Sequence, residues 1–165
     1  MQGMNTQSGM HLAHAFFEMG ANALHEQPSD RRHINEGYVE KTIAGTASIA
    51  FACEVAIKNV ICKRGACENE LRGHNLEQLY KKLTDNDRHC IESITIRLCN
   101  GPNGNAYGHE QFIDDLQTSA RVFEELRYWY EIPNPGKGKQ ARVAFMHGFG
   151  RAVILWMDAF LENKS

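Results

Sequence analysis

The stretch YVEKTIAGTASIAFACEVAIKNVI, residues 38–61, is the most apolar part of the chain and decides the fold. Its apolar side chains continue over several turns at helical spacing, which predicts a helix over about 36–63. Small residues recur along it and would let neighbouring helices approach closely; they are Ala44, Gly45, Ala47, Ala50 and Ala52. We therefore expect this segment to be the central helix of the molecule.

Helical periodicity continues on both sides of the central segment. Apolar residues at steps of three and four predict further helices over about 9–26, 109–131 and 138–162. The segment 85–99 includes SITIRL, which alone could form a strand, but no partner strand is evident, so we favour a helix. The glycine- and asparagine-rich stretch at about 100–108 predicts a loop.

These elements together predict a single all-α domain over residues 1–165. The length suits one hydrophobic core, and contents of 42% hydrophobic and 23% charged residues are ordinary for a globular protein. We expect a helical bundle of four long helices plus one or two short ones.

The charge and the apolar pattern limit the class of protein. A net charge of -2 gives no global attraction to nucleic acid, so such binding would need a local basic patch. The N-terminus lacks a charged start followed by an apolar run, which argues against a signal peptide. No apolar stretch approaches the roughly 20 residues that span a bilayer. We expect a cytoplasmic protein without a membrane partner.

The cysteines and histidines give no sign of a disulfide framework or of a cofactor. Five cysteines, an odd number, argue against paired disulfides, and none has zinc-finger spacing. His11 and His14 stand three apart, a spacing that can ligate a metal, but no matching carboxylate pattern is visible. We therefore expect no metal and no cofactor.

A short helix with a clear start is predicted in GHNLEQLYKKL, residues 73–83. Asn75 is a good N-cap, and Gln78 can complete a capping box three residues later. The apolar residues that follow recur at helical spacing and form one stripe. His74, just before this cap, is a candidate for a hydrogen bond across the domain.

Two ionisable side chains stand among apolar neighbours. Glu54 lies in the central helix, and Lys58 follows at the favourable spacing for an ion pair. Either the pair is partly exposed, or Glu54 faces a polar pocket that must supply a cationic partner. Arg127 follows an apolar stripe and is one candidate, with Glu131 as an alternative carboxylate for it. Tyr130 adds aromatic surface suited to guanidinium stacking or to an interface.

Arg142 and His147 form a second pair of candidates near the start of the last helix. Four residues separate them, and a step of five turns about 140° around a regular helix. The two side chains would therefore not share one face. They could converge if the helix began irregularly, or if a second subunit completed the site.

The order of these motifs resembles the HEPN group of small bacterial helical domains. The matching stretches are SIAFACEVAIKNVI at 48–61, GHNLEQLYKKL at 73–83 and RYWYE at 127–131, followed by a final apolar helix. The resemblance covers most of residues 36–162. It implies an antiparallel bundle of four to five helices that commonly forms a homodimer, and aromatic residues near Trp129 and Trp156 would suit such an interface.

The resemblance also implies two functions. Family members are linked to RNA or nucleotide binding, toxin–antitoxin pairs and phage defence, and many are metal-independent endoribonucleases. Those enzymes use an arginine and a histidine separated by four to six residues, and Arg142 and His147 match that spacing. A polar residue usually follows the arginine, whereas Val143 stands here, so the motif is degenerate.

We expect a homodimer that binds RNA, a nucleotide or a cognate partner protein in a toxin–antitoxin, defence or stress system. The alternative is an endoribonuclease in which His147 is the base or acid and Arg142 binds the phosphate.

Overall fold

The computed structural model describes residues 6–25, 37–65, 71–100, 106–127 and 142–162. These residues form seven helices and no strand. The helices are α1 (Thr6–His25), α2 (Tyr38–Lys63), α3 (Leu76–Lys81), α4 (Asp85–Asn100), α5 (His109–Thr118), α6 (Val122–Arg127) and α7 (Val143–Glu162). The all-α prediction is confirmed for the described part of the chain.

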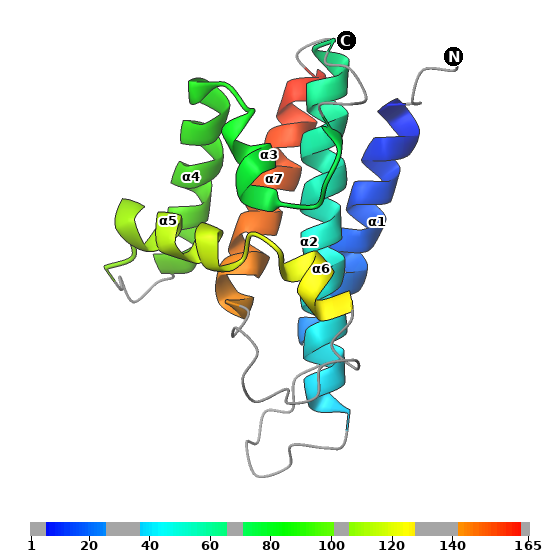
Figure 1. The fold of residues 1–165 in the computed structure, drawn as a ribbon, viewed down its shortest axis with the longest axis vertical. Helices are drawn as coiled ribbons and strands as arrows, with labels where there is room; N and C mark the ends of the chain where they lie inside the picture. Colours follow the sequence, from blue (N-terminus) through cyan, green and yellow to red (C-terminus); the bar gives the residue numbers. More distant parts are fainter. Residues whose placement is uncertain (1–5, 26–36, 66–70, 101–105, 128–141, 163–165) are drawn as a thin grey trace.

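The four long helices form a layer in the order α4, α7, α2, α1 (Figure 1). Helix α2 packs against α1 on one side and α7 on the other, and α7 also packs against α4. The short helices α3, α5 and α6 lie across one face of this layer, where α3 and α6 contact α2. The opposite face of the layer is therefore formed by the long helices themselves.

Helix α2 is the central helix, as its sequence predicts. Seven of its apolar side chains are fully buried, namely Ile49, Ala50, Ala52, Cys53, Ala56, Ile57 and Val60. Its small residues allow the close approach expected of them: a Cβ atom on Gly20 of α1 would lie 2.5 Å from the carbonyl oxygen of Gly45. The backbones of α1 and α2 are therefore in direct contact at this crossing.

Helix α7 completes the core from the other side of α2. Phe145 and Phe149 stack with ring centroids 5.3 Å apart, and Phe112 of α5 packs against both. A Cβ atom on Gly150 would lie 2.5 Å from Cγ2 of Ile49, so α7 also approaches α2 closely.

The capped helix and the ambiguous segment both fold as predicted. The Asn75 side chain accepts a hydrogen bond from the backbone N–H of Gln78 at 2.9 Å, so Asn75 is the N-cap of α3. The segment with strand-like composition is helix α4. Its last residue, Asn100, makes two 3.0 Å hydrogen bonds with the backbone of Tyr107. Residues 101–105 of the predicted loop lie outside the described residues.

The prediction of one continuous helix over 109–131 is wrong. A tight turn at residues 119–121 separates α5 from α6. The carbonyl of Ala120 in this turn accepts a 2.8 Å hydrogen bond from the N–H of Leu76, a donor at the start of α3 that has no partner within its own helix. After the turn α6 packs on α2, so tertiary contacts override local helix propensity here.

Helix α2 bears on the expectation that no segment spans a membrane. Within the described residues it is the one helix long and apolar enough to cross a bilayer by length and composition. Of its most apolar window, 67% is buried inside the molecule. A helix enclosed on several sides by others in a soluble bundle has the same composition, so this finding is weak evidence for a membrane span.

Candidate functional site

Glu54 lies at the centre of a polar cluster between α2 and α3. Its side chain is buried, with a relative exposure of 3%, and its Oε1 accepts a 2.7 Å hydrogen bond from Nζ of Lys58. Nδ1 of His74 lies 2.9 Å from both carboxylate oxygens, so it carries the proton that it donates. Lys58 also donates to the carbonyl of Gly73 at 2.8 Å. We call Glu54, Lys58 and His74 the Glu54 cluster.

The Glu54 cluster joins the turn before α3 to the central helix. Glu54 faces a polar pocket in which Lys58 supplies the cationic partner and His74 a second hydrogen bond, which is the second of the two alternatives that its sequence left open. The ring of Phe123 packs 5.5 Å from that of His74 and covers the cluster from α6. Because the carboxylate oxygens face donors from two segments, this cluster holds the fold together.

Three residues predicted near Glu54 lie outside what the structure describes. Arg127 is the last residue of α6, but its side chain is not among the described groups. Tyr130 and Glu131 also lie outside the described residues. The proposed contact between Glu54 and Arg127 therefore stays a prediction.

A second polar cluster surrounds Asp87 at the start of α4. Asp87 accepts hydrogen bonds from the guanidinium of Arg64, from Nε1 of Trp156 at 2.9 Å and from the hydroxyl of Thr84 at 2.5 Å. Burial alone would raise the pKa of this carboxyl, but the hydrogen bonds from Arg64, Thr84 and Trp156 outweigh it and lower the pKa well below its usual range. This cluster was not predicted, although the pattern Thr84-x-x-Asp87 is a helix-start signal.

Trp156 corrects one expectation about the surface. We expected aromatic residues near Trp156 to be exposed and to suit a dimer interface. Its side chain is instead 5% exposed and donates to Asp87. The reason is that α7 is buried on several sides, against α2, α4 and α1.

Arg142 lies just before α7 and pairs with two carboxylates of α5. Its Nε is 3.1 Å from Asp115, and its terminal nitrogen is 3.3 Å from Asp114. The hydroxyl of Tyr107 donates to Asp115 at 3.0 Å. These side chains line a cavity of about 510 Å³ together with Glu110 and Gln111. Arg142 therefore sits in acidic surroundings that neutralise its charge.

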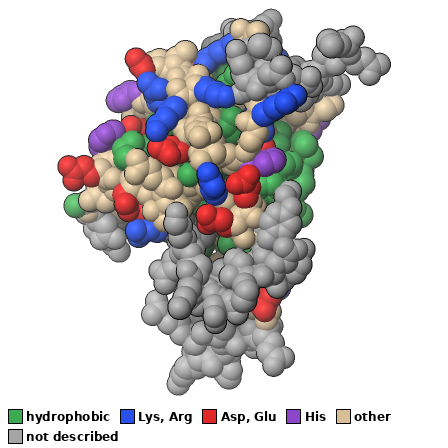
Figure 2. All heavy atoms as spheres, viewed as in Figure 1, with side chains coloured by type: hydrophobic (Ala, Val, Ile, Leu, Met, Phe, Trp, Pro, Cys, Tyr) green, Lys and Arg blue, Asp and Glu red, His purple; other side chains and the backbone are tan. Residues whose placement is uncertain are grey.

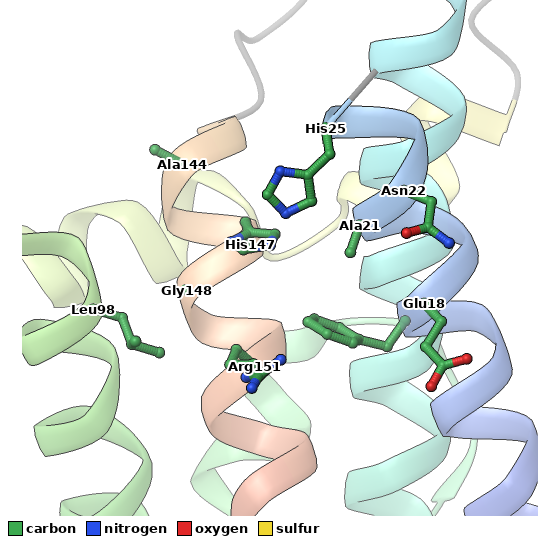
Figure 3. Close-up of a pocket in the computed structure, with 10 residues that line it drawn as sticks. Glu18, Ala21, Asn22, His25, Leu98, Ala144, His147, Gly148 and Arg151 are labelled. Atoms are coloured by element: carbon green, nitrogen blue, oxygen red, sulfur yellow. The ribbon is translucent and has the colours of Figure 1, made fainter. Parts of the chain in front are cut away.

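His147 lines a different cavity, of about 540 Å³, on the face of the layer away from α5 and α6 (Figure 3). Helices α1, α4 and α7 form its walls, and we call it the α1–α4–α7 cleft. Its lining residues are Phe17, Glu18, Ala21, Asn22, His25, Leu98, Ala144, His147, Gly148 and Arg151. The described residues thus place Arg142 and His147 in separate cavities, in agreement with their predicted position on different faces.

Three basic side chains meet in this cleft. The imidazole of His25 points from α1 towards α7, and its ring centroid is 5.6 Å from that of His147, with the planes at 87° (Figure 3). Arg151 follows His147 by one helical turn and lies on the same face of α7. Within the described part of the chain, none of the three forms an ion pair with a carboxylate.

The electrostatic environment of His147 is set by burial and by nearby basic side chains. Burial lowers the pKa of His147, and the nearby positive charges of His25 and Arg151 lower it further. Glu18 is the one carboxylate among the lining residues. A half-buried imidazole beside other basic groups is an environment typical of binding and catalytic sites.

Sequence reasoning found His147 but missed its two basic neighbours. The spacing of His147 and Arg151, four residues apart on a predicted helix, is a signal that places both on one face. No such signal exists for His25, because its distance from His147 depends on the tertiary packing of α1 against α7. The described residues contain no group of three or more His, Cys, Asp or Glu side chains that could hold a metal ion.

The cleft can offer guanidinium and imidazole donors to an anionic ligand and an imidazole pair to a proton transfer. No protein-family model, curated protein or solved structure matches the chain.

Proposed function

We propose that the chain is a HEPN-like domain that binds the phosphate of RNA or of a nucleotide in the α1–α4–α7 cleft. One observation carries the proposal: His147 and Arg151 on one face of α7 oppose His25 of α1, with no ion pair to a carboxylate in the described residues. Guanidinium and imidazole N–H groups are strong donors to phosphate oxygens.

Several basic residues on the face that carries α3 fit this role less well. Figure 2 shows Lys and Arg side chains on the face that carries α3, but acidic side chains lie among them. The ion pairs on this face include Lys58–Glu54, Lys81–Glu77 and Arg88–Asp85. Their positive charge is already neutralised locally, whereas that of Arg151 is not.

The resemblance to the HEPN group supports the wider setting of the proposal. It favours a cytoplasmic homodimer in a prokaryotic toxin–antitoxin, defence or stress system, with a cognate protein as an additional partner. Light scattering at micromolar concentration tests the dimer, and a monomeric mass would contradict it.

Anisotropy of a labelled single-stranded RNA, with unlabelled nucleotides as competitors, tests the binding site. We expect Arg151→Ala to weaken binding by about tenfold, the loss of one charge-assisted contact. Arg121→Ala is the matched control, because Arg121 is also exposed but lies in the turn between α5 and α6. Equal affinity of wild type and Arg151→Ala would refute the site, and no binding of any probe would refute the function.

A second candidate function is an endoribonuclease, favoured by the two imidazoles that face each other. One imidazole would take the proton of the ribose 2′-hydroxyl, whose oxygen attacks the adjacent phosphorus. The bond from phosphorus to the 5′-oxygen breaks, and the second imidazole protonates that oxygen. The products are a 2′,3′-cyclic phosphate and a free 5′-hydroxyl.

In this second candidate His147 keeps its predicted role, while Arg151 replaces Arg142 as the phosphate ligand within one chain. Arg142 would take part only if a second subunit brought it across an interface. RNA incubated with the protein and EDTA tests the activity, which His147→Ala should abolish and Arg142→Ala should leave intact. Cleavage that persists in His147→Ala would exclude His147 from the chemistry.

A further inference from the structure

We infer that anion binding in the α1–α4–α7 cleft is coupled to uptake of a proton by His147, so that the ligand is held more tightly as the pH falls. This inference rests on the proposed function and adds its regulation. In this proposal His147 is neutral when the cleft is empty and protonated when a phosphate is bound in it.

The first support is a contrast among the histidines. Three of them pair with carboxylates: His14 with Asp158 at 2.8 Å, His74 with Glu54 at 2.9 Å, and His109 with Glu92 at 2.6 Å. His147 instead has the ring of His25 at 5.6 Å and that of Phe17 at 6.0 Å. In each of these three pairs a carboxylate accepts a hydrogen bond from the imidazole, and a bound anion would take that place in the cleft.

The second support is the set of groups that face His147 from each helix around it. Helix α1 contributes Glu18 and His25, and α7 contributes Arg151. Helix α4 presents the apolar Leu98, and the Cys99 thiol lies against Gly148, where burial raises its pKa. The cations near His147 outnumber the one carboxylate once His25 is charged, so a proton on His147 meets net repulsion in the empty cleft.

A bound phosphate reverses this balance. Its negative charge lies among the three basic groups and stabilises the protonated form of His147 by attraction at short range. Burial, which lowers the pKa of His147 in the empty cleft, makes that attraction stronger because less water screens it. Linkage is reciprocal, so if the anion favours the proton, the proton must favour the anion to the same extent.

The probe must keep a constant charge for the protein's own titration to be visible. A phosphate monoester loses its second proton near pH 6, which would mask the effect. A 2′-O-methylated oligouridylate avoids this, because its phosphodiesters stay singly charged over about pH 5 to 8. It also lacks the free 2′-hydroxyl, so cleavage cannot interfere with the measurement.

The experiment is calorimetric titration of the full chain with this oligonucleotide at constant ionic strength. We expect the affinity to rise about tenfold between about pH 7.5 and 5.5, the range in which a histidine changes charge. Repeating the titration in buffers of different ionisation enthalpy counts the protons taken up, and we expect net uptake near neutral pH.

Three variants assign the proton. His147→Gln should bind with an affinity that depends little on pH, because glutamine keeps a hydrogen-bond donor but cannot become charged. His109→Gln is the matched control and should keep the wild-type pH dependence. Arg151→Ala should weaken binding at every pH and move the pH dependence to higher pH, because the pKa of His147 rises when this neighbouring positive charge is removed. Circular dichroism verifies that each variant is folded.

The outcomes separate the inference from the function on which it rests. No binding at any pH contradicts both. Binding that is tight but independent of pH, or a pH dependence that survives in His147→Gln, contradicts the inference and leaves the proposed function standing.

Discussion

The Glu54 cluster and the α1–α4–α7 cleft both place ionisable side chains among apolar helices, but they differ in how the charge is balanced. In the cluster a buried carboxylate faces the donors of Lys58 and His74. In the cleft three basic side chains, His25, His147 and Arg151, lie together without a paired carboxylate among the described residues. A set of charges that is balanced within the protein holds a fold together, whereas basic groups without a paired carboxylate are suited to a ligand.

The position of the two regions agrees with this difference. The Glu54 cluster lies under α3 and α6, where Phe123 covers it. The cleft lies on the opposite face, where the long helices leave a cavity between α1, α4 and α7 (Figure 3). Substitutions in the cluster should therefore change stability, and substitutions in the cleft should change binding.

The largest effect is expected at the centre of the cluster. Glu54→Ala should lower the free energy of unfolding by about 3 kcal/mol, because it leaves Lys58 and His74 without their shared acceptor. Chemical denaturation measures the loss. Glu77→Ala is the control: Glu77 forms an i,i+4 pair with exposed Lys81, and its removal should cost about 0.4 kcal/mol. Equal losses of unfolding free energy in the two variants would show that the buried contacts of Glu54 stabilise the fold no more than a surface ion pair does.

The next largest effect is expected at Asp87, the buried carboxylate of the second cluster, whose contribution to stability depends on pH. The pKa of Asp87 is lowered from its ordinary 3.8, so its contribution to stability is present above about pH 4 and is lost as the pH falls further. Asp87→Asn should cost about 2 kcal/mol at neutral pH and flatten the loss of stability in acid. Thermal melting between about pH 5 and 2.5 measures this. An unchanged acid profile in the variant would assign the titration to other carboxyls.

A smaller effect is expected at the edge of the Glu54 cluster. His74→Ala should lower the free energy of unfolding by about 1 kcal/mol, because Glu54 keeps Lys58 as its partner and the imidazole is partly exposed. His89→Ala is the control, since His89 is exposed on α4. A loss as large as that of Glu54→Ala would mean that His74 carries the cluster alone.

The smallest effect on stability is expected in the cleft. Arg151→Ala should change the free energy of unfolding by less than about 0.5 kcal/mol, because the exposed guanidinium forms no ion pair within the described residues. The removal of a like charge beside His147 favours a slight gain. Chemical denaturation of the variant, measured together with its ligand binding, tests this prediction. A loss of several kcal/mol would place Arg151 with the structural groups.

Local sequence patterns predict much of the fold. The central helix, the Asn75 cap and the Glu54–Lys58 pair are all features of neighbouring residues, so spacing and capping chemistry predict them. The turn at 119–121 contains no glycine or proline and was missed, because the contact that defines it comes from Leu76.

The candidate site was harder to predict, because its parts come from distant segments. His74 reaches Glu54 across 20 residues, and Arg142 reaches Asp114 across 28. His25 meets His147 through the packing of the first helix against the last. These distances depend on how the helices pack, so the sequence alone does not give them. Helical spacing predicts only that His147 and Arg151 share one face of α7.

The glycine contacts of α2 also set the dimensions of the cleft. Gly20 lets α1 touch the backbone of α2 at Gly45, and Gly150 lets α7 rest on Ile49. Helices α1 and α7, which carry His25 and His147, are thus both positioned by their close contacts with α2. A methyl group at position 20 would push α1 outward and move the imidazoles of His25 and His147 apart, so glycines that do not themselves line the cleft fix its width.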